Sequence, residues 1–166
     1  IGMSGGVVGG EYRNSMEAVN FSLGHDDGIT ETGLQDADVI LVGVSRSGKT
    51  PACLYLAMQY GIRAANYPII PEELERNQLP GTLAHYRDKI FGLTIAADRL
   101  HRIRTERRPD SKYAALENCR QEVRLAEDLM KQEGVNLLDS TSRSVEEISS
   151  LIMQQLSMKA ARKLVG

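Results

Sequence analysis

Residues 43–50 have the spacing of a phosphate-binding loop. They are Gly43, Val44, Ser45, Arg46, Ser47, Gly48, Lys49 and Thr50, which fit the pattern G-x-x-x-x-G-K-[ST] at every fixed position. In such a loop, successive backbone N–H groups surround phosphate oxygens and the lysine adds a positive charge. The Thr50 hydroxyl is the predicted ligand of a Mg²⁺ ion. The loop therefore predicts a site for a nucleoside di- or triphosphate.

Five arginines that follow further along the chain form a second candidate group. They are Arg99, Arg102, Arg104, Arg107 and Arg108. Guanidinium groups suit phosphoryl transfer, which needs cations around the transferring group. On a helix Arg99 and Arg102 share a face, while Arg104 points elsewhere. The alternative is a solvated basic face paired with Glu106.

Three further residues are candidates for catalysis. Arg46, inside the loop, can reach a donor or acceptor phosphate, and its alternative is a solvent-facing variable position. Asp26 and Asp27 precede the loop, where a carboxylate can accept a proton from an attacking hydroxyl or hold Mg²⁺ through water. The spacing of these two aspartates alone favours the alternative, an ordinary helix-ending turn in which Asp and Gly are common.

The segments on both sides of the loop favour a phosphate site over a chance glycine-rich turn. Residues 38–42 read as a buried strand before the loop, and residues 51–60 read as a helix after it. The N-terminal end of that helix would face the phosphates.

The rest of the chain alternates strands and helices. Predicted strands are 38–42, 63–70, 89–95 and 135–138, and predicted helices are 12–23, 51–60, 71–75, 98–107, 114–133 and one that begins after Ser144. This order predicts an α/β, P-loop kinase-like fold in three layers, with a mainly parallel sheet and helices on both faces. Ligands bind beyond the carboxyl ends of such strands.

Composition argues against several other classes of protein. The 166 residues have a net charge of -2, which suggests no nucleic-acid partner. No apolar run approaches the ~20 residues of a membrane helix, and the first residues do not resemble a signal peptide. Cys53 and Cys119 read as buried fillers in a cytoplasmic protein, and no histidine–cysteine cluster has zinc spacing.

The loop does not itself define the reaction. A GTPase would add the sequence Asn-Lys-x-Asp, which is missing. An ATP-driven motor usually places an acid at the end of a buried strand, whereas the strand at 90–95 ends without one, although Asp98 is close. The sequence therefore favours a small phosphotransferase.

Residues 36–51 resemble the signature of the bacterial and plastid regulatory proteins of phosphoenolpyruvate synthase and of pyruvate, phosphate dikinase. The similar stretches elsewhere are 16–21, 25–28, 64–68, 91–95, 99–100, 103–104, 106–107, 111–114 and 144–148. The resemblance extends over nearly all of residues 12–156 and is more specific than the loop alone.

This resemblance implies a bifunctional enzyme. Such proteins use ADP as the donor to phosphorylate a threonine or serine of the target, which inactivates it. Inorganic phosphate then attacks the phosphothreonine, and pyrophosphate leaves. The implied partner is phosphoenolpyruvate synthase or pyruvate, phosphate dikinase, and residues 76–80 and 110–114 look closer to the synthase branch.

The resemblance also implies an organisation for the chain and its site. Residues 1–35 are expected to form a flexible start and a helix that link to a missing N-terminal domain, and residues 36–160 a nucleotide-binding kinase/phosphorylase domain. The ADP phosphates would lie on residues 43–50, with Lys49 and Arg46 stabilising charge. Thr50 would hold Mg²⁺ where the metal is used, and Asp27 or Asp26 would orient the target hydroxyl.

Two other functions stay open. One is an ATP-dependent kinase of a small molecule or nucleotide, with an arginine-bearing lid. The choice of phosphoryl donor, ATP rather than ADP, distinguishes this function from the one that the resemblance implies. The other is a non-catalytic nucleotide-sensing module, which would bind ADP without transfer to a protein. The sequence is compatible with a homo-oligomer and does not define the oligomeric state.

Overall fold

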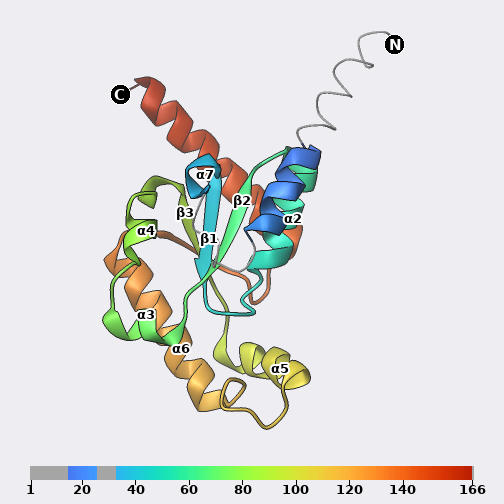
Figure 1. The fold of residues 1–166 in the computed structure, drawn as a ribbon, viewed down its shortest axis with the longest axis vertical. Helices are drawn as coiled ribbons and strands as arrows, with labels where there is room; N and C mark the ends of the chain where they lie inside the picture. Colours follow the sequence, from blue (N-terminus) through green and yellow to red (C-terminus); the bar gives the residue numbers. More distant parts are fainter. Residues whose placement is uncertain (1–14, 26–32, 166) are drawn as a thin grey trace.

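Four parallel strands form the centre of the computed structural model, which describes residues 15–25 and 33–165 (Figure 1). The strands are β1 (Val39–Gly43), β2 (Ala64–Pro68), β3 (Ile90–Thr94) and β4 (Asn136–Asp139), in the order β2-β1-β3-β4. In the register, Leu41 of β1 lies between Asn66 of β2 and Phe91 of β3. Because β1 is an inner strand and fully buried, its apolar run is continuous, as parallel sheets require.

Helices connect the strands. The α-helices are α2 (Lys49–Tyr60), α3 (Pro71–Arg76), α4 (Gly81–Ala84), α5 (Ala97–Arg107), α6 (Leu116–Gln132) and α7 (Val145–Val165), and the short 3₁₀ helices are η1 (Leu34–Asp36) and η2 (Arg87–Lys89). Residues 15–24 are also helical. They pack onto the sheet, because Ser22 Oγ donates to the Ala64 carbonyl at 2.8 Å and Ala18 is fully buried.

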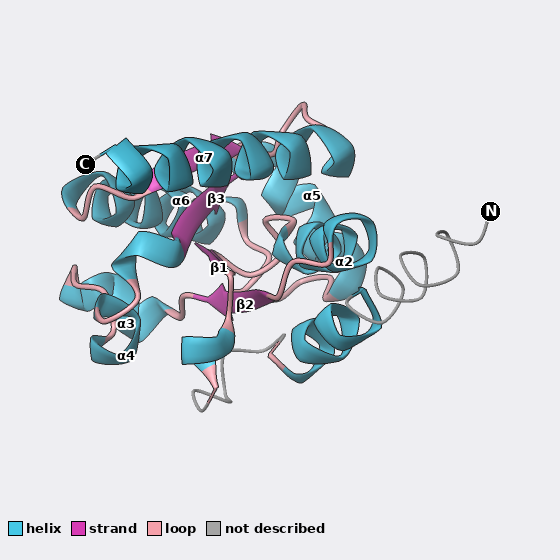
Figure 2. Ribbon diagram, turned by 90° about the horizontal axis from the view of Figure 1, so that it is seen from above, coloured by secondary structure: helices cyan, strands magenta, loops and turns pink. Residues whose placement is uncertain are grey.

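The two faces of the sheet are covered by different helices. Successive side chains of a strand point to opposite faces. Val39 and Leu41 therefore join one apolar cluster with residues of α2 and α7, while Ile40 and Val42 join another with residues of α3 and α6. Figure 2 shows α2 on one side of β1 and β2 and α3 on the other. The predicted three-layer α/β fold is confirmed.

Most predicted elements are present, with shifted ends. Helix α2 begins at Lys49 rather than at residue 51, because Gly48 takes a left-handed conformation (φ 103°) from which the helix starts directly. Gly61 ends it, also left-handed at φ 64°. The start of α7 has the predicted capping box, in which Ser144 N–H donates to Glu147 Oε1 and Glu147 N–H donates to Ser144 Oγ.

Within residues 15–25 and 33–165, no helix is both long enough and apolar enough to cross a membrane.

Gly43, the last residue of β1, tests how closely the phosphate loop is built onto the sheet. A Cβ atom at this position would lie 2.5 Å from the backbone oxygen of Leu93 in β3. We expect Gly43→Ala to lower the free energy of unfolding by about 2 kcal/mol, because neither strand can move aside easily. Gly81→Ala is the control, since nothing lies within 4 Å of a Cβ there. Urea unfolding of both variants measures the difference, and equal stability of the two would contradict the close approach.

Candidate functional site

The phosphate loop lies at the carboxyl end of β1 and runs into α2. The Gly43 carbonyl accepts from Ile69 N–H at 2.9 Å, and the Val44 carbonyl accepts from Ser47 N–H at 3.3 Å. Arg46 and Gly48 both have left-handed backbone conformations, with φ of 72° and 103°. The left-handed region favours glycine, so the pattern's second glycine meets a backbone requirement at position 48. Arg46 adopts the same region with a side chain present.

Lys49 is held inside the loop. Its side chain is buried, and Nζ donates to the Val44 carbonyl at 2.6 Å and to Ser47 Oγ at 3.4 Å. The ammonium group thus spans the loop from its second residue to its fifth. An anion that enters the loop would meet this charge together with the N-terminal end of α2.

Thr50 is oriented by β2. Asn66 Nδ2 donates to Thr50 Oγ1 at 2.8 Å, and Asn66 N–H donates to the His25 carbonyl at 2.8 Å. In the described part of the chain, no group of three or more His, Cys, Asp or Glu side chains could hold a metal ion. The role of Thr50 as a Mg²⁺ ligand stays a prediction.

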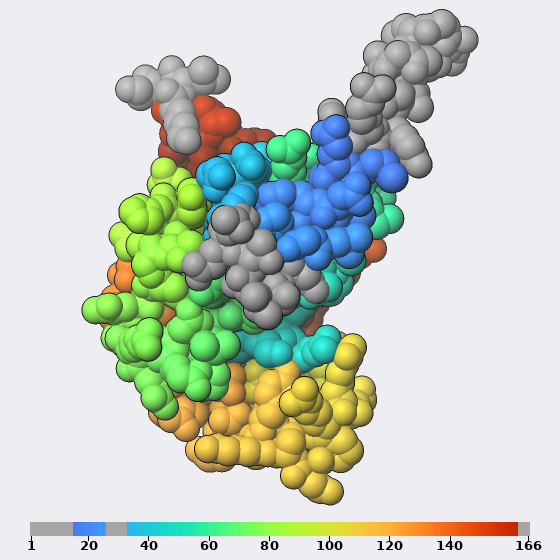
Figure 3. All heavy atoms as spheres, in the orientation of Figure 1, coloured from blue at the N-terminus to red at the C-terminus, as the bar shows by residue number. Residues whose placement is uncertain are grey.

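A cleft of about 550 Å³ opens beside the loop. It is lined by Ser45, Arg46, Gly48, Lys49, Thr50, Pro51, Asn66, Pro68 and Arg107. In Figure 3 the surface of the α5 region (yellow) adjoins that of the start of α2 (teal). The size of this loop cleft is in the range of small-molecule sites, and its lining brings two arginines to the predicted lysine.

The structure separates the five arginines. Arg99, Arg102 and Arg107 are all exposed on α5, but of these three only Arg107 lines the loop cleft. Arg104 is fully buried, which differs from the solvated basic face that its charge suggested. The reason is an unforeseen partner, Glu122 of α6, which the buried guanidinium contacts through two of its nitrogens at 2.9 and 3.2 Å.

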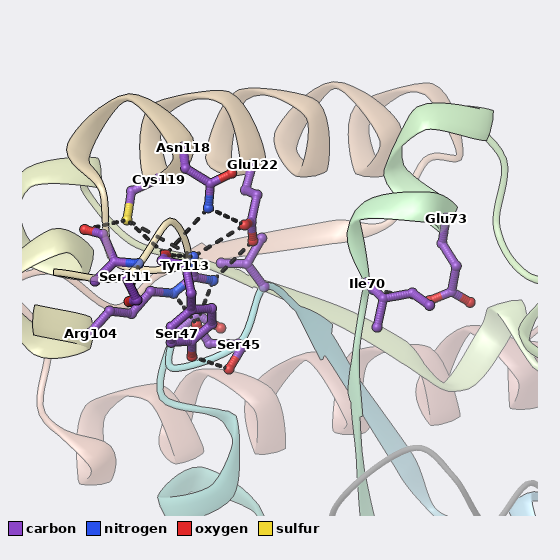
Figure 4. Close-up of polar contacts among 12 residues, drawn as sticks. Ser45, Ser47, Ile70, Glu73, Arg104, Ser111, Tyr113, Asn118, Cys119 and Glu122 are labelled. Carbon is purple, nitrogen blue, oxygen red and sulfur yellow. Dashed lines mark hydrogen bonds and ion pairs between the residues drawn. The ribbon is translucent and has the colours of Figure 1, made fainter. Parts of the chain in front are cut away.

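Arg104 also joins α5 to the phosphate loop. Its Nε and Nη2 donate to the Ser45 carbonyl at 3.3 and 3.1 Å, and its Nη1 donates to the Tyr113 carbonyl at 2.9 Å (Figure 4). The Tyr113 ring stacks on the guanidinium, 4.1 Å away, and its hydroxyl lies 2.6 Å from Ser45 Oγ. We call Ser45, Arg104, Tyr113 and Glu122 the buried latch. It connects α5, α6 and the segment between them to the second variable position of the loop.

The charge state of the latch follows from its contacts. Burial works against the Arg104 cation, but the hydrogen bond and charge of Glu122 outweigh it, so the pKa of Arg104 lies above its usual value. Burial raises the pKa of the Cys119 thiol, whose Sγ lies 3.9 Å from Arg104 Nη1. The latch is therefore an ion pair beside a neutral thiol.

One signal in the sequence points to this partner. Glu122 lies three residues after Cys119 and four before Ala126, on the face of α6 that the apolar stripe predicts to be buried. A carboxylate on a buried stripe needs a cation. Which cation it meets depends on packing between α5 and α6, which the sequence pattern does not give.

A further contact from the end of β4 supports the loop. Ser140 Oγ lies 2.7 Å from the Ser47 carbonyl and 3.1 Å from the Thr94 carbonyl. Asp26 and Asp27 lie outside the described residues, so their catalytic role stays a prediction. His25, just before them, stacks on Phe21 with ring centroids 4.1 Å apart.

A parallel α/β sheet with a lysine-bearing loop at its carboxyl edge is consistent with a three-layer, P-loop-like fold. The chain belongs to the kinase/pyrophosphorylase family, whose model matches residues 4–153.

Three bacterial relatives share most of this chain, and each is provisionally named a phosphoenolpyruvate synthase regulatory protein. The protein of Methylobacillus flagellatus is 58% identical over 96% of this chain and 59% of its own length. The Azoarcus protein is 59% identical over 89% of this chain and 54% of its own length. The Janthinobacterium protein is 62% identical over 89% of this chain and 52% of its own length. The chain thus spans a little over half the length of these relatives.

The buried latch gives a prediction for stability. Arg104→Met leaves the Glu122 carboxylate buried without its cation, and Glu122→Leu leaves the guanidinium without its anion. We expect each single variant to lose about 3–5 kcal/mol of unfolding free energy, and the double variant to lose less than either.

Chemical denaturation of the four proteins in this cycle measures the coupling. The exposed pair of Arg120 and Glu117, 3.6 Å apart, supplies the control, because Arg120→Met should change stability by less than about 0.5 kcal/mol. Additive losses at Arg104 and Glu122 would show that the two side chains do not depend on each other.

Proposed function

We propose that this chain carries the phosphoryl-transfer site of an ADP-dependent protein kinase that phosphorylates a threonine or serine of phosphoenolpyruvate synthase, or of pyruvate, phosphate dikinase, and reverses this with inorganic phosphate. The single observation that carries the proposal is the cleft beside the phosphate loop, because Lys49 and Arg46 of the loop and Arg107 of α5 all line it. Family membership and the names of the relatives support the direction of the proposal.

In the proposed binding step, the diphosphate of ADP lies on the N–H groups of residues 43–50. Lys49, already held across the loop, places its charge on the non-bridging oxygens. The N-terminal end of α2 adds to that field. These groups are fixed before the ligand arrives, so little reorganisation accompanies binding.

In the forward reaction, the target hydroxyl oxygen attacks the β-phosphorus of ADP. A new O–P bond forms, the bond from that phosphorus to the bridging oxygen breaks, and AMP leaves. We assign the hydroxyl proton to Asp27 or Asp26. Arg46 and Arg107, which both line the cleft, stabilise charge on the transferring group.

In the reverse reaction, an oxygen of inorganic phosphate attacks the phosphothreonine phosphorus. The bond from that phosphorus to the threonine oxygen breaks, pyrophosphate leaves, and the threonine oxygen takes up a proton to become a hydroxyl again. Phosphate is already an anionic nucleophile, so this direction depends less on a base. Positioning and cation contacts do most of the work in phosphoryl transfer. One cation-rich cleft therefore serves both directions.

Mg²⁺, where it is used, would be held by Thr50 and by phosphate oxygens, and it would offset negative charge on those oxygens. Asn66 fixes the Thr50 hydroxyl for this role. A cytoplasmic location and self-association stay predictions.

The deciding experiment incubates ADP and purified phosphoenolpyruvate synthase with this chain and, in parallel, with a full-length relative. Mass spectrometry then maps any phosphothreonine, and pyrophosphate release is followed after phosphate is added. Transfer from ATP to a free metabolite would replace the proposal with a small-molecule kinase. Binding of ADP without any transfer by either protein would leave a nucleotide-sensing module.

Lys49→Ala tests the loop directly. Because the variant removes the charge that spans the loop, we expect kcat/KM to fall by about 10²–10³ in both directions of the reaction. Lys131→Ala, at an exposed position of α6, is the charge-matched control and should retain the wild-type rates. Full activity of Lys49→Ala in either direction of the reaction would contradict the proposed mechanism.

Thr50→Val tests the metal role. This change keeps the side-chain shape but removes the hydroxyl, so the Mg²⁺ concentration for half-maximal transfer should rise by about tenfold or more. Thr50→Ser restores a hydroxyl and should recover most of the affinity. A Mg²⁺ titration of the transfer rate compares the three proteins, and an unchanged midpoint for Thr50→Val would remove Thr50 from the metal site.

A further inference from the structure

A second, smaller cleft adjoins the loop cleft. It has a volume of about 210 Å³ and is lined by Ser45, Arg46, Arg107, Arg108 and Tyr113. We call it the arginine pocket. Ser45, Arg46 and Arg107 also line the loop cleft, whereas Arg108 and Tyr113 line the arginine pocket but not the loop cleft. The two clefts therefore share a wall that carries two guanidinium groups.

The arginine pocket concentrates positive charge. Three guanidinium groups line it, and among the described residues no ion pair involves Arg46, Arg107 or Arg108. Arg104 differs, because Glu122 already balances its charge. Since these three cations have no carboxylate partner among the described residues, they repel one another, and an anion between them would reduce that repulsion. Guanidinium forks match the oxygen geometry of phosphate in particular.

One residue of the pocket wall, Tyr113, is fixed in place. Tyr113 is held at both ends, since its hydroxyl lies 2.6 Å from Ser45 Oγ and its carbonyl accepts from Arg104 and Asn118. The Arg108 guanidinium lies over the ring of the same tyrosine, 5.7 Å from the centre of the Tyr113 ring. The backbone at Arg46 is left-handed, a conformation that persists in non-glycine residues where the surroundings enforce it.

We propose that the arginine pocket binds a second phosphate group beside the phosphates of the loop cleft. The pocket is smaller than the usual range for nucleotide-sized ligands, which suits a single phosphate. Two sources have this chemistry, namely free inorganic phosphate and the phosphomonoester of a modified threonine. The assignment rests on the proposed function, because a reaction that joins two phosphates needs two adjacent anion sites with cations between them.

Arg108→Gln is the variant that isolates this pocket, because Arg108 does not line the loop cleft. Binding of inorganic phosphate is measured by calorimetry on the chain saturated with ADP, so that the loop cleft is filled. We expect the Kd for phosphate to rise about tenfold, since one charge-assisted contact is lost. The Kd for ADP should stay within about twofold of wild type, because the groups that hold ADP are untouched.

Arg102→Gln is the matched control. Arg102 is exposed on α5 and lines neither cleft, so the Arg102→Gln substitution removes the same charge without changing the pocket. Its Kd for phosphate should equal that of wild type. An equal Kd in wild type and Arg108→Gln, or an equal loss in Arg102→Gln, would overturn the assignment.

A second arm distinguishes the two sources. A phosphothreonine peptide and its unphosphorylated form compete with phosphate for the ADP-saturated chain. Displacement by the phosphopeptide alone, lost in Arg108→Gln, assigns the pocket to the modified threonine. Phosphate binding that depends on Arg108 and resists the phosphopeptide assigns it to the free nucleophile.

The experiments can contradict phosphate binding by the arginine pocket and the proposed kinase function independently of each other. Arg108-dependent phosphate binding without any transfer to a protein would leave the pocket and remove the kinase. Transfer in both directions with phosphate binding that is indifferent to Arg108 would leave the kinase and remove the pocket. Circular dichroism spectra of Arg108→Gln and Arg102→Gln, compared with wild type, check that each variant is folded.

Discussion

The ion pair between Arg104 and Glu122 sets the position of α5, and the candidate site depends on that position. Helical residues three and four apart share a face. Arg107, the last residue of α5, lies three residues after the buried Arg104 and so on the same face, and both Arg107 and Arg108, which follows the helix, line a cleft beside the phosphate loop. Arg99 and Arg102 fall on other faces of α5 and line neither cleft. One buried carboxylate therefore decides which arginines can meet a ligand.

The latch does not need to stabilise the protein to have this effect. Removing two charges from water costs several kcal/mol per ion, and an apolar pair of similar volume is often no less stable. What an apolar pair cannot supply is the directed contact with the Ser45 carbonyl, which holds the loop and α5 in one arrangement. We interpret the latch as a source of geometric specificity, with Leu100 supplying apolar burial on the same helix.

The sequence predicted the parts of this site that depend on local pattern. The loop at 43–50, the strand before it and the helix after it are neighbours in the chain, so spacing and propensity were sufficient. The latch joins Ser45 to residues 59 and 68 positions away, and its geometry arises only from packing of α5 on α6. The contact between Asn66 and Thr50 likewise depends on the parallel register of β1 and β2. An isolated polar residue in an apolar strand is a hint of such a contact, but it does not identify the partner.

The shared wall between the two clefts has a consequence for how they work together. Arg46 and Arg107 line both, so a phosphate in one cleft reduces the positive charge available to a phosphate in the other, but it also fixes the shared guanidinium groups in place. The first effect opposes double occupancy and the second favours it, because ordering a long side chain is completed only once. Whatever the sign, the coupling is reciprocal, so ADP changes the affinity for phosphate by the same factor as phosphate changes the affinity for ADP. In the proposed reaction, where ADP serves one direction and phosphate the other, this coupling would make the occupancy of each cleft depend on the concentration of the other ligand.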